Sequence, residues 1–193
     1  MRLIIASNNA HKVHEIKEIL ADRFEEILSL KEAGICHETV EDGLSFAENA
    51  LKKAREISNI SGCATLADDS GLCVNALDGA PGIYSARFAC EHNGQKSDAA
   101  NNALLLEKLA DKEDKSAYFI CCIALVYPDG REIIANGYMH GKITDNARGK
   151  CGFGYDPLFI PEGEERTVAE MSDSEKNAIS HRANALKNLL SKI

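Results

Sequence analysis

The sequence lacks the features that mark membrane, secreted and multi-domain proteins. No stretch approaches the roughly eighteen consecutive apolar residues that a membrane-spanning helix needs. The apolar run at residues 2–6 is shorter than the h-region of a secretory signal peptide. Only 4 of the 193 residues are proline, and neither an internal repeat nor a low-complexity linker interrupts the chain. We therefore predict no membrane contact and a single domain over residues 1–193.

Positive charge is also in deficit. The chain has 22 Lys and Arg residues against 30 Asp and Glu residues, which gives a formal net charge of −8. Polymeric nucleic acid is therefore not an expected partner, because its binding depends mainly on neutralising phosphates. A small polyphosphate can still bind an acidic protein at a point where a metal ion and a few lysines converge. The 45% apolar content is close to the globular average and excludes wholesale disorder.

The seven cysteines form no Cys-x-x-Cys pair, which argues against a zinc site. Cys63, Cys73, Cys121 and Cys122 lie in apolar runs, where cysteine behaves as a small hydrophobic residue. An odd number of cysteines placed in this way is typical of a reducing compartment, so we expect a cytoplasmic protein.

The apolar pattern predicts strands that alternate with amphipathic helices, as in an α/β fold. Helices are expected after residue 9, after Ser97 and after the capping boxes that begin at Ser45 and Ser172. Residues 117–127 and 132–138 flank a Pro-Asp-Gly turn and predict a β-hairpin. The remaining apolar runs predict short strands at residues 2–6, 24–30, 64–67, 72–74 and 158–160.

Two adjacent carboxylates, Asp68 and Asp69, follow the predicted strand at residues 64–67, and Ser70-Gly71 then predicts a turn. Carboxylates at the end of a buried strand lie where α/β folds bind ligands. Neighbouring negative charges repel, and a bound Mg²⁺ is the simplest compensation. Alternatively, the cluster is a polar turn whose side chains make only local hydrogen bonds.

The polar segment Ser7–Lys12 joins the first predicted strand to the first predicted helix. A helix N-terminus presents free N–H groups that attract anions, and a neighbouring lysine adds a point charge for phosphate. The Gly-x-x-x-x-Gly-Lys spacing of a P-loop is absent. An ordinary N-cap is an equally good interpretation of the segment.

Residues 152–156, Gly-Phe-Gly-Tyr-Asp, form a second dense cluster. Glycines on both sides of an aromatic ring allow close backbone approach, and aromatic faces stack on nucleobases. Asp156 can accept hydrogen bonds from a base edge. Alternatively, the cluster is a glycine-rich turn. Two further basic groups are ambiguous: Lys53 lies off the apolar face of its helix, and Lys176, His181 and Arg182 are predicted to lie on a polar side of the C-terminal segment.

Taken together, these clusters resemble the inosine triphosphate pyrophosphatases, also called XTP/dITP diphosphatases. The resemblance extends from residue 6 to residue 182, and in combination the motifs are highly specific. The matching segments are Ala6-Ser7-Asn8-Asn9-x-x-Lys12, Glu41-x-Gly43-x-x-Phe46-x-Glu48-Asn49-Ala50-x-x-Lys53-Ala54, Ala67-Asp68-Asp69-Ser70-Gly71-Leu72, Gly79-Ala80-Pro81-Gly82-Ile83-Tyr84-Ser85-Ala86-Arg87, Gly152-Phe153-Gly154-Tyr155-Asp156-Pro157 and Glu175-Lys176-Asn177-x-x-Ser180-His181-Arg182.

The resemblance implies a mixed α/β fold with an elongated central sheet and two lobes that flank a nucleotide-binding cleft. It implies Mg²⁺-assisted hydrolysis of ITP, dITP and XTP to the nucleoside monophosphate and pyrophosphate, by water attack at the α-phosphorus. This activity would clear deaminated purines from the nucleotide pool, and family members are usually homodimers. A related Maf-like pyrophosphatase, acting on modified pyrimidines or dTTP, is one alternative function, and substrate profiling separates it from the first. A nucleotide sensor without turnover is the other, and the retention of Glu41, Asp68, Asp69 and Lys53 argues against it.

The resemblance also implies a role for each matched residue. Asp69 would be the catalytic residue and would bind Mg²⁺ together with Glu41, for which Glu38 is the alternative, and Asp68 would be a second carboxylate on the metal side. The phosphates would be held by Ser7, Asn8, Asn9, Ala10, His11, Lys12, Lys53, Ser70 and Lys176. The base pocket would be formed by Phe153, Gly154, Tyr155, Asp156, His181 and Arg182.

Overall fold

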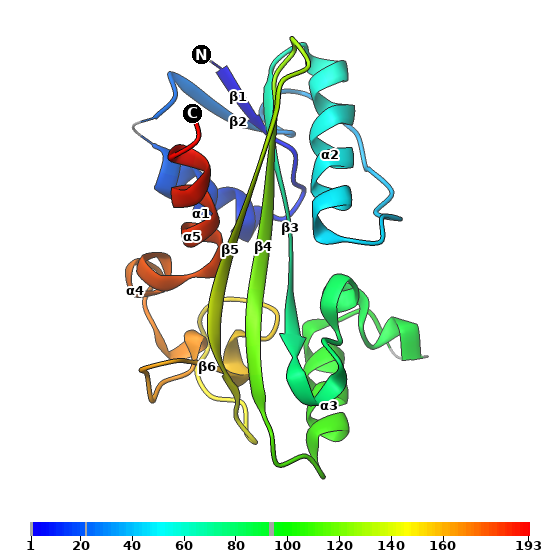
Figure 1. Cartoon of the computed structure of the whole chain (residues 1–193), viewed down its shortest axis with the longest axis vertical. Helices are drawn as coiled ribbons and strands as arrows, with labels where there is room; N and C mark the ends of the chain where they lie inside the picture. Colours follow the sequence, from blue (N-terminus) through cyan, green and yellow to red (C-terminus); the bar gives the residue numbers. More distant parts are fainter. Residues whose placement is uncertain (1, 22, 93–94) are drawn as a thin grey trace. The chain divides into compact units, whose positions relative to one another are not determined.

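The structure is a computed structural model that describes residues 2–21, 23–92 and 95–193. Six strands form one sheet in the order β2-β1-β3-β4-β5-β6 (Figure 1). Strand β1 pairs in parallel with β2 and β3, whereas β5 and β6 are antiparallel. The predicted mixed α/β class is therefore confirmed. The strands are β1 (Arg2–Ile5), β2 (Glu26–Ser29), β3 (Ala64–Val74), β4 (Ser116–Val126), β5 (Glu132–Ile143) and β6 (Phe159–Pro161).

Five α-helices are assigned in the described residues, and several short 3-10 helices lie in the connections. None of these helices is long and apolar enough to cross a membrane. All seven cysteines are in the described part of the chain and carry free thiols. The α-helices are α1 (Ala10–Leu20), α2 (Phe46–Ser61), α3 (Asp98–Leu109), α4 (Asp173–Ile179) and α5 (His181–Leu190).

The chain divides into two compact units. Unit 1 contains Met1–Asp69, Cys121–Gly137 and Arg182–Ile193, and unit 2 contains Ser70–Ile120 and Tyr138–His181. The divisions fall inside β3 and β4, inside β5, and next to the first residue of α5. No linker therefore separates the two units within the described residues, which is why composition alone marks no boundary.

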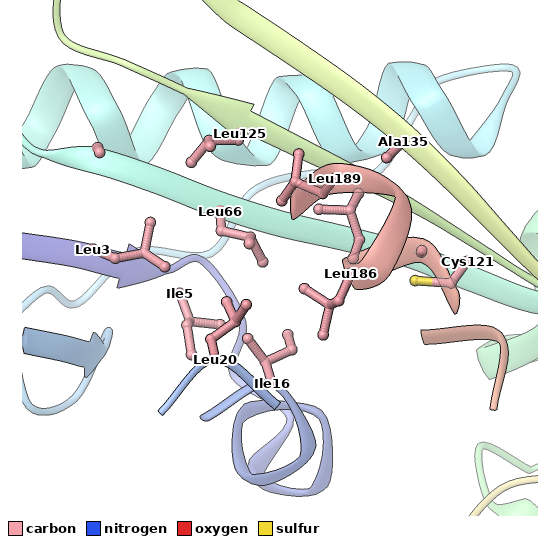
Figure 2. Close-up of a cluster of buried hydrophobic side chains, with 13 residues drawn as sticks. Leu3, Ile5, Ile16, Leu20, Leu66, Cys121, Leu125, Ala135, Leu186 and Leu189 are labelled. Atoms are coloured by element: carbon pink, nitrogen blue, oxygen red, sulfur yellow. The ribbon is translucent and has the colours of Figure 1, made fainter. Parts of the chain in front are cut away.

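Unit 1 has a hydrophobic core on each face of its strands, because successive residues of a strand point to opposite faces. Leu3 and Ile5 of β1 face helices α1 and α5, where they join Leu186 and Leu189 (Figure 2). On the other face, a second cluster packs β1 against Ala50, Ala54 and Ile57 of α2. Figure 1 shows α1 and α5 on one side of these strands and α2 on the other.

The described residues of unit 2 contribute one core cluster. Leu72 and Val74 of β3 pack with Leu105 and Leu109 of α3 and with Phe119 of β4. The same cluster includes Tyr155 of the predicted base loop, Leu158 and the first residue of β6, Phe159. The base loop is thus fixed on the core of unit 2.

The structure differs from the sequence-based prediction at two places that matter for function. Strand β3 does not end at residue 67; it continues through Asp68, Asp69, Ser70 and Gly71 to Val74. The predicted Ser-Gly turn is therefore wrong. In addition, the C-terminal segment forms two helices, because Ser180 has an extended backbone (ψ 151°) that ends α4 before α5 begins.

Candidate active site

The two adjacent aspartates lie inside a strand, so their side chains point to opposite faces of the sheet. Asp68 lies on the face of Leu66 and Cys121, toward α1 and α5. Asp69 lies on the face of Ala67 and is hydrogen-bonded by a side chain of α2. The repulsion that favoured a shared metal ion is thus relieved by geometry, and each carboxylate has its own set of cations.

Asp68 is the centre of a buried ion network. The residue is 1% exposed, and its carboxylate contacts Lys12 Nζ at 2.9 Å and Arg182 Nη2 at 3.2 Å. Arg182 also donates to the carboxylate of Glu15. Burial by itself raises the pKa of Asp68, but the charges of Lys12, Arg182 and Lys53 outweigh it and hold the pKa well below its ordinary value. Asp68 therefore stays ionised and acts as a counter-ion for two cations.

Asp69 has a weaker set of partners. Its Oδ2 accepts a hydrogen bond from Asn49 Nδ2 at 3.0 Å, and its Oδ1 lies 3.8 Å from Lys53 Nζ. Burial raises the pKa of Asp69 above its ordinary value, and the negative charge of Glu41 adds to this shift, against the opposing effects of Lys53 and Lys12. A carboxylate with a raised pKa is a better proton acceptor than a free aspartate.

Lys53 joins Asp69 to the acidic loop that precedes α2. Its ammonium group contacts Glu41 Oε1 at 2.6 Å, and the lysine side chain is only 12% exposed. Lys53 is therefore largely buried, although it lies off the apolar face of its helix. Burial lowers the pKa of Lys53, but the three carboxylates Asp69, Asp68 and Glu41 raise it further, and the amine stays charged. Glu41 rather than the exposed Glu38 is thus brought to Asp69.

These contacts bear on the expected Mg²⁺ site. In the described residues, no group of three His, Cys, Asp or Glu side chains is arranged to hold a metal ion. Glu41 and Asp69 instead share the ammonium of Lys53, so a cation already lies beside both carboxylates. Mg²⁺ commonly binds through one or two carboxylates and completes its shell with water and substrate phosphates. The donor set fits an ion of that kind and does not fit a metal held by protein alone.

The predicted phosphate loop is an N-cap in this structure. Asn9 Oδ1 accepts from the backbone N–H groups of His11 and Lys12 at 3.0 and 3.3 Å. Asn8, Asn9, Ala10 and His11 are exposed, and Ser7 is half-buried. The loop therefore presents an exposed helix N-terminus next to the Lys12–Asp68 pair.

In unit 2, Asp156 organises the predicted base loop. Its Oδ2 accepts from the backbone N–H of Phe153 and from Lys176 Nζ, both at 3.0 Å. Lys176 Nζ also lies 4.6 Å from the centre of the Phe153 ring. Gly152 has a φ of +74°, and a Cβ there would come within 2.1 Å of Asp156 Oδ2, so only glycine fits. A phenyl ring and a buried ammonium are thereby held side by side.

Helix α3 holds the next residue of the loop by both of its backbone groups. Asp98 Oδ2 accepts from Gly154 N at 2.7 Å, and Asn102 Nδ2 donates to Gly154 O at 3.0 Å. Asp98 and Asn102 are four residues apart and lie on one face of α3. The main chain at Gly154 is thus fixed by side chains that the sequence motifs did not include.

A family model, that of the Ham1 family, matches residues 3–192 of the chain. The chain belongs to the Ham1 family. It is 51% identical over 196 residues to a protein of Clostridium perfringens named dITP/XTP pyrophosphatase, with 97% of this chain and 95% of that protein covered. The Ham1 protein of Coxiella burnetii has a similar structure, with a TM-score of 0.88, 40% identity and full coverage of both chains. The Staphylococcus aureus Ham1 protein gives a TM-score of 0.87 at 39% identity, covering 100% and 97%.

In the structure of this Ham1-family chain, three residues predicted for the base pocket have other surroundings: Arg182, Tyr155 and His181. Arg182 is 1% exposed and binds Asp68 and Glu15, so its contacts do not support the prediction that it binds a base. Tyr155 is also buried, and its hydroxyl donates to Ser85 O at 2.8 Å. Its ring packs in the unit 2 core, where burial raises its pKa, rather than presenting a face to a ligand.

His181 and Lys176 are buried as well, contrary to the polar surface predicted for this segment. The His181 ring stacks on Phe119, with ring centres 4.9 Å apart and planes 14° from parallel. The sequence places Lys, His and Arg near a helix start but cannot show that each has a buried partner on another element. Ser70, also predicted to bind phosphate, is half-buried in β3.

Sequence reasoning gave no role to Glu15, Asn49, Asp98 or Asn102, although Asn49 lies in one of the matching segments. A signal existed for Asn49, because polar residues recur at helical spacing along α2, at Asn49, Lys53 and Glu56. That polar stripe runs along the flank of the apolar face and contacts the acidic loop. Glu15 carries no such signal, because a single carboxylate within a helix is usually solvated.

Proposed function

We propose that the chain hydrolyses non-standard purine nucleoside triphosphates (ITP, dITP and XTP) to the nucleoside monophosphate and pyrophosphate, and so clears deaminated purines from the nucleotide pool. Two facts support the proposal. The chain belongs to the Ham1 family, and a relative that is 51% identical is named dITP/XTP pyrophosphatase. In addition, unit 1 gathers lysines and carboxylates beside an exposed helix N-terminus, as a triphosphate site requires.

The observation that carries the proposal is the charge balance of that cluster. Four carboxylates (Glu15, Glu41, Asp68 and Asp69) contact three cations (Lys12, Lys53 and Arg182). With all of these groups ionised, the cluster has one negative charge in excess. A triphosphate would be repelled unless further positive charge arrives with it. Mg²⁺ bound to the nucleotide supplies that charge, and Glu41 and Asp69 are the carboxylates that would hold it.

In the reaction that we propose, Asp69 accepts a proton from a water molecule. The water oxygen forms a bond to the α-phosphorus, and the bond between that phosphorus and the bridging oxygen of the β-phosphate breaks. Lys12 and Lys53 stabilise the negative charge on the leaving pyrophosphate. When bound, Mg²⁺ neutralises phosphate charge in the transition state. Asn49 holds Asp69 by Oδ2, and the ammonium of Lys53 lies near its Oδ1, so the carboxylate has a fixed orientation toward the water.

We assign recognition of the base to Phe153, Lys176 and Asp156 of unit 2. The phenyl ring would stack on the purine, a contact worth about 1–3 kcal/mol per base. The resemblance assigned Lys176 to the phosphates, but its ammonium is fixed by Asp156 beside the Phe153 ring, so we propose instead that it donates to the 6-oxo group of hypoxanthine or xanthine. In adenine the same ammonium would meet an amino group, and the unmade hydrogen bond would reject ATP.

The test is product analysis with ITP and ATP in the presence of Mg²⁺. We expect IMP and pyrophosphate from ITP, and a kcat/KM for ITP about a hundredfold or more above that for ATP. Equal kcat/KM for the two nucleotides would reject the base assignment. Release of orthophosphate instead of pyrophosphate would reject attack at the α-phosphorus. Addition of a chelator should abolish turnover and metal replacement should restore it.

A pair of variants tests the assignment of Asp69. Asp69→Asn should remain folded by circular dichroism and lose nearly all turnover, because the amide cannot accept the proton. Asp42→Asn is the matched control, since Asp42 is an exposed neighbour of Glu41 that pairs with Lys52. Substantial Mg²⁺-dependent activity in Asp69→Asn would exclude it as the proton acceptor.

We also propose a homodimer and a cytoplasmic location, as the family resemblance and the free thiols suggest. Sedimentation of the purified chain at micromolar concentration tests the first, since a monomer mass would reject it. Fractionation of cells that express the protein tests the second.

A further inference from the structure

Asn49 is a buried amide that uses both of its ends. The residue is 1% exposed and lies in the first turn of α2. Its Nδ2 donates to Asp69 Oδ2 at 3.0 Å, and its Oδ1 accepts from the backbone N–H of Gly43 at 2.8 Å. Asn49 therefore joins the candidate proton acceptor on β3 to the loop that carries Glu41.

The loop approaches Asn49 so closely that only glycine fits at position 43. A Cβ at Gly43 would lie 2.7 Å from Asn49 Oδ1 and 2.9 Å from the Cβ of Glu48. These separations are shorter than atoms without a bond between them adopt, so a side chain would push the loop away from α2. The short contact between Gly43 N and Asn49 thus depends on the residue types at both positions.

Further contacts fix the same loop along α2 in one register. His37 Nε2 and Thr39 Oγ1 lie within 2.7 and 2.6 Å of Glu56 Oε2. The Leu44 N–H donates to Glu48 Oε2 at 2.7 Å. Glu56 and Glu48 lie on either side of Asn49 and Lys53 along the helix, so the loop is anchored at both ends. Glu41 lies between the anchors and has little freedom to shift.

We propose that Asn49 is a positioning residue that sets Asp69 and the Glu41 loop in a fixed relation for the reaction. It does not touch the reacting atoms. Its amide holds one oxygen of Asp69 and keeps the loop at the distance at which Lys53 contacts both carboxylates. The inference deepens the proposed function and rests on it. A misplacement of about 1 Å in such a site typically costs about a hundredfold in rate.

An amide suits this position because it offers one donor and one acceptor. Aspartate has nearly the same shape and could still accept from Gly43 N, but it has no donor for Asp69 and would place two carboxylates 3.0 Å apart. Alanine removes both bonds. The two variants therefore separate the contact to Asp69 from the contact to Gly43.

The experiment measures kcat, KM and amide exchange for Asn49→Ala and Asn49→Asp. We expect both variants to lower kcat for ITP at saturating Mg²⁺ by about 10- to 100-fold, with KM changed less than about threefold. Exchange of the Gly43 amide with solvent, followed by NMR, should accelerate strongly in Asn49→Ala and much less in Asn49→Asp. The exchange measurement needs neither metal nor substrate.

Ser58→Ala is the matched control. Ser58 is buried on the same helix and donates to the Cys63 carbonyl at 3.0 Å, away from the carboxylates. The control should lower the melting temperature and leave kcat within about twofold, as expected for a lost hydrogen bond that is purely structural. A kcat in Asn49→Ala no lower than in Ser58→Ala, or an unchanged Gly43 amide, would overturn the inference.

Gly43→Ala keeps the test decisive if Asn49→Ala does not fold at the assay temperature. Its Cβ forces the loop away from Asn49 while Asp69 keeps its own hydrogen bond, so kcat should fall in the same way. Activity equal to that of the unmodified protein would reject the inference. If the unmodified protein releases no pyrophosphate from ITP, the proposed function fails, and the exchange data still decide whether Asn49 couples the loop to the helix.

Discussion

Replacement of Arg182 with methionine would remove the cation that Asp68 and Glu15 share. The guanidinium group is 1% exposed and contacts Asp68 Oδ2 through Nε and Nη2 at 3.3 and 3.2 Å, and Glu15 through Nη1. Methionine preserves much of the length and volume of the side chain without its charge. Lys12 stays beside Asp68, so Glu15 is the carboxylate that mainly loses its neutralising cation.

The expected loss of stability is large. Removal of one partner from a buried ion pair typically costs about 3–5 kcal/mol, because the remaining charge stays buried. For a chain of 150–250 residues, 1 kcal/mol corresponds to about 2–4 °C in melting temperature. Arg182→Met should therefore lower the melting temperature by about 6–20 °C. Urea unfolding followed by circular dichroism gives the free energy directly.

A double-mutant cycle with Glu15→Gln supplies the control. Glutamine removes the carboxylate charge that Arg182→Met leaves behind, so the double variant should lose less stability than the two single variants together. A coupling of about 0.5–3 kcal/mol is expected for residues in one network. A loss below about 1 kcal/mol in Arg182→Met, or perfect additivity, would refute the network. A selective fall in the ITP over ATP preference with unchanged stability would instead support the base contact predicted from the sequence.

Three further predictions concern the buried groups of each unit. Tyr155→Phe loses the hydrogen bond to Ser85 O and should lower the free energy of unfolding by about 1 kcal/mol. Its kcat/KM for ITP should stay within twofold of that of the unmodified protein. A large loss of base selectivity would contradict a structural role for Tyr155. Asn102→Ala removes the hydrogen bond to Gly154 O and should raise KM for ITP by about fivefold, the equivalent of one hydrogen bond, with kcat unchanged. Equal rates of amide exchange with solvent at residues 153–155 in the variant and the unmodified protein would contradict this prediction. Burial raises the pKa of Cys122 to about 11 from 9.0, so its neutral thiol stabilises the fold fully below pH 9, and this contribution is lost as pH rises toward 11. In Cys122→Ala, the free energy of unfolding from urea titrations should therefore decline less steeply between pH 9 and 11. Identical slopes in the variant and the unmodified protein would contradict this prediction.

The regular elements were predictable because their signals are local. A continuous apolar run predicted β1, and β-type runs on either side of a Pro-Asp-Gly turn predicted the β4–β5 hairpin. Helical periodicity with capping residues predicted α1, α2 and α3. The roles of the phosphate loop and of the base loop came from the family resemblance and stay predictions, because the local chemistry of each loop also fits an N-cap or a glycine-rich turn. What these signals could not give is the partner of each polar side chain, because Arg182 meets Glu15 only after residues 167 positions apart come together.

Burial of Lys53, Lys176 and Arg182 escaped prediction for the same reason. A charged side chain is buried only when a counter-charge arrives from another element, so position on its own helix gives no information. Tyr155 was misjudged for a related reason. An aromatic ring between a glycine and an aspartate fits a base-stacking loop and a core equally well, and only the Ser85 carbonyl decides.

The Asp68–Asp69 pair shows how strand geometry assigns different chemistry to identical neighbours. A turn would have placed both carboxylates on one ligand, whereas the strand sends them to opposite faces. Asp68 meets two cations at 2.9 and 3.2 Å, and its pKa falls. Asp69 lies 3.8 Å from Lys53, which also serves Glu41, and its pKa rises. Where the environments of two acids move their pKa values apart, the one with the raised pKa is suited to proton transfer and the other to holding cations. This divergence makes Asp69 the better candidate for the base and gives Asp68 the separate task of keeping Lys12 and Arg182 in place.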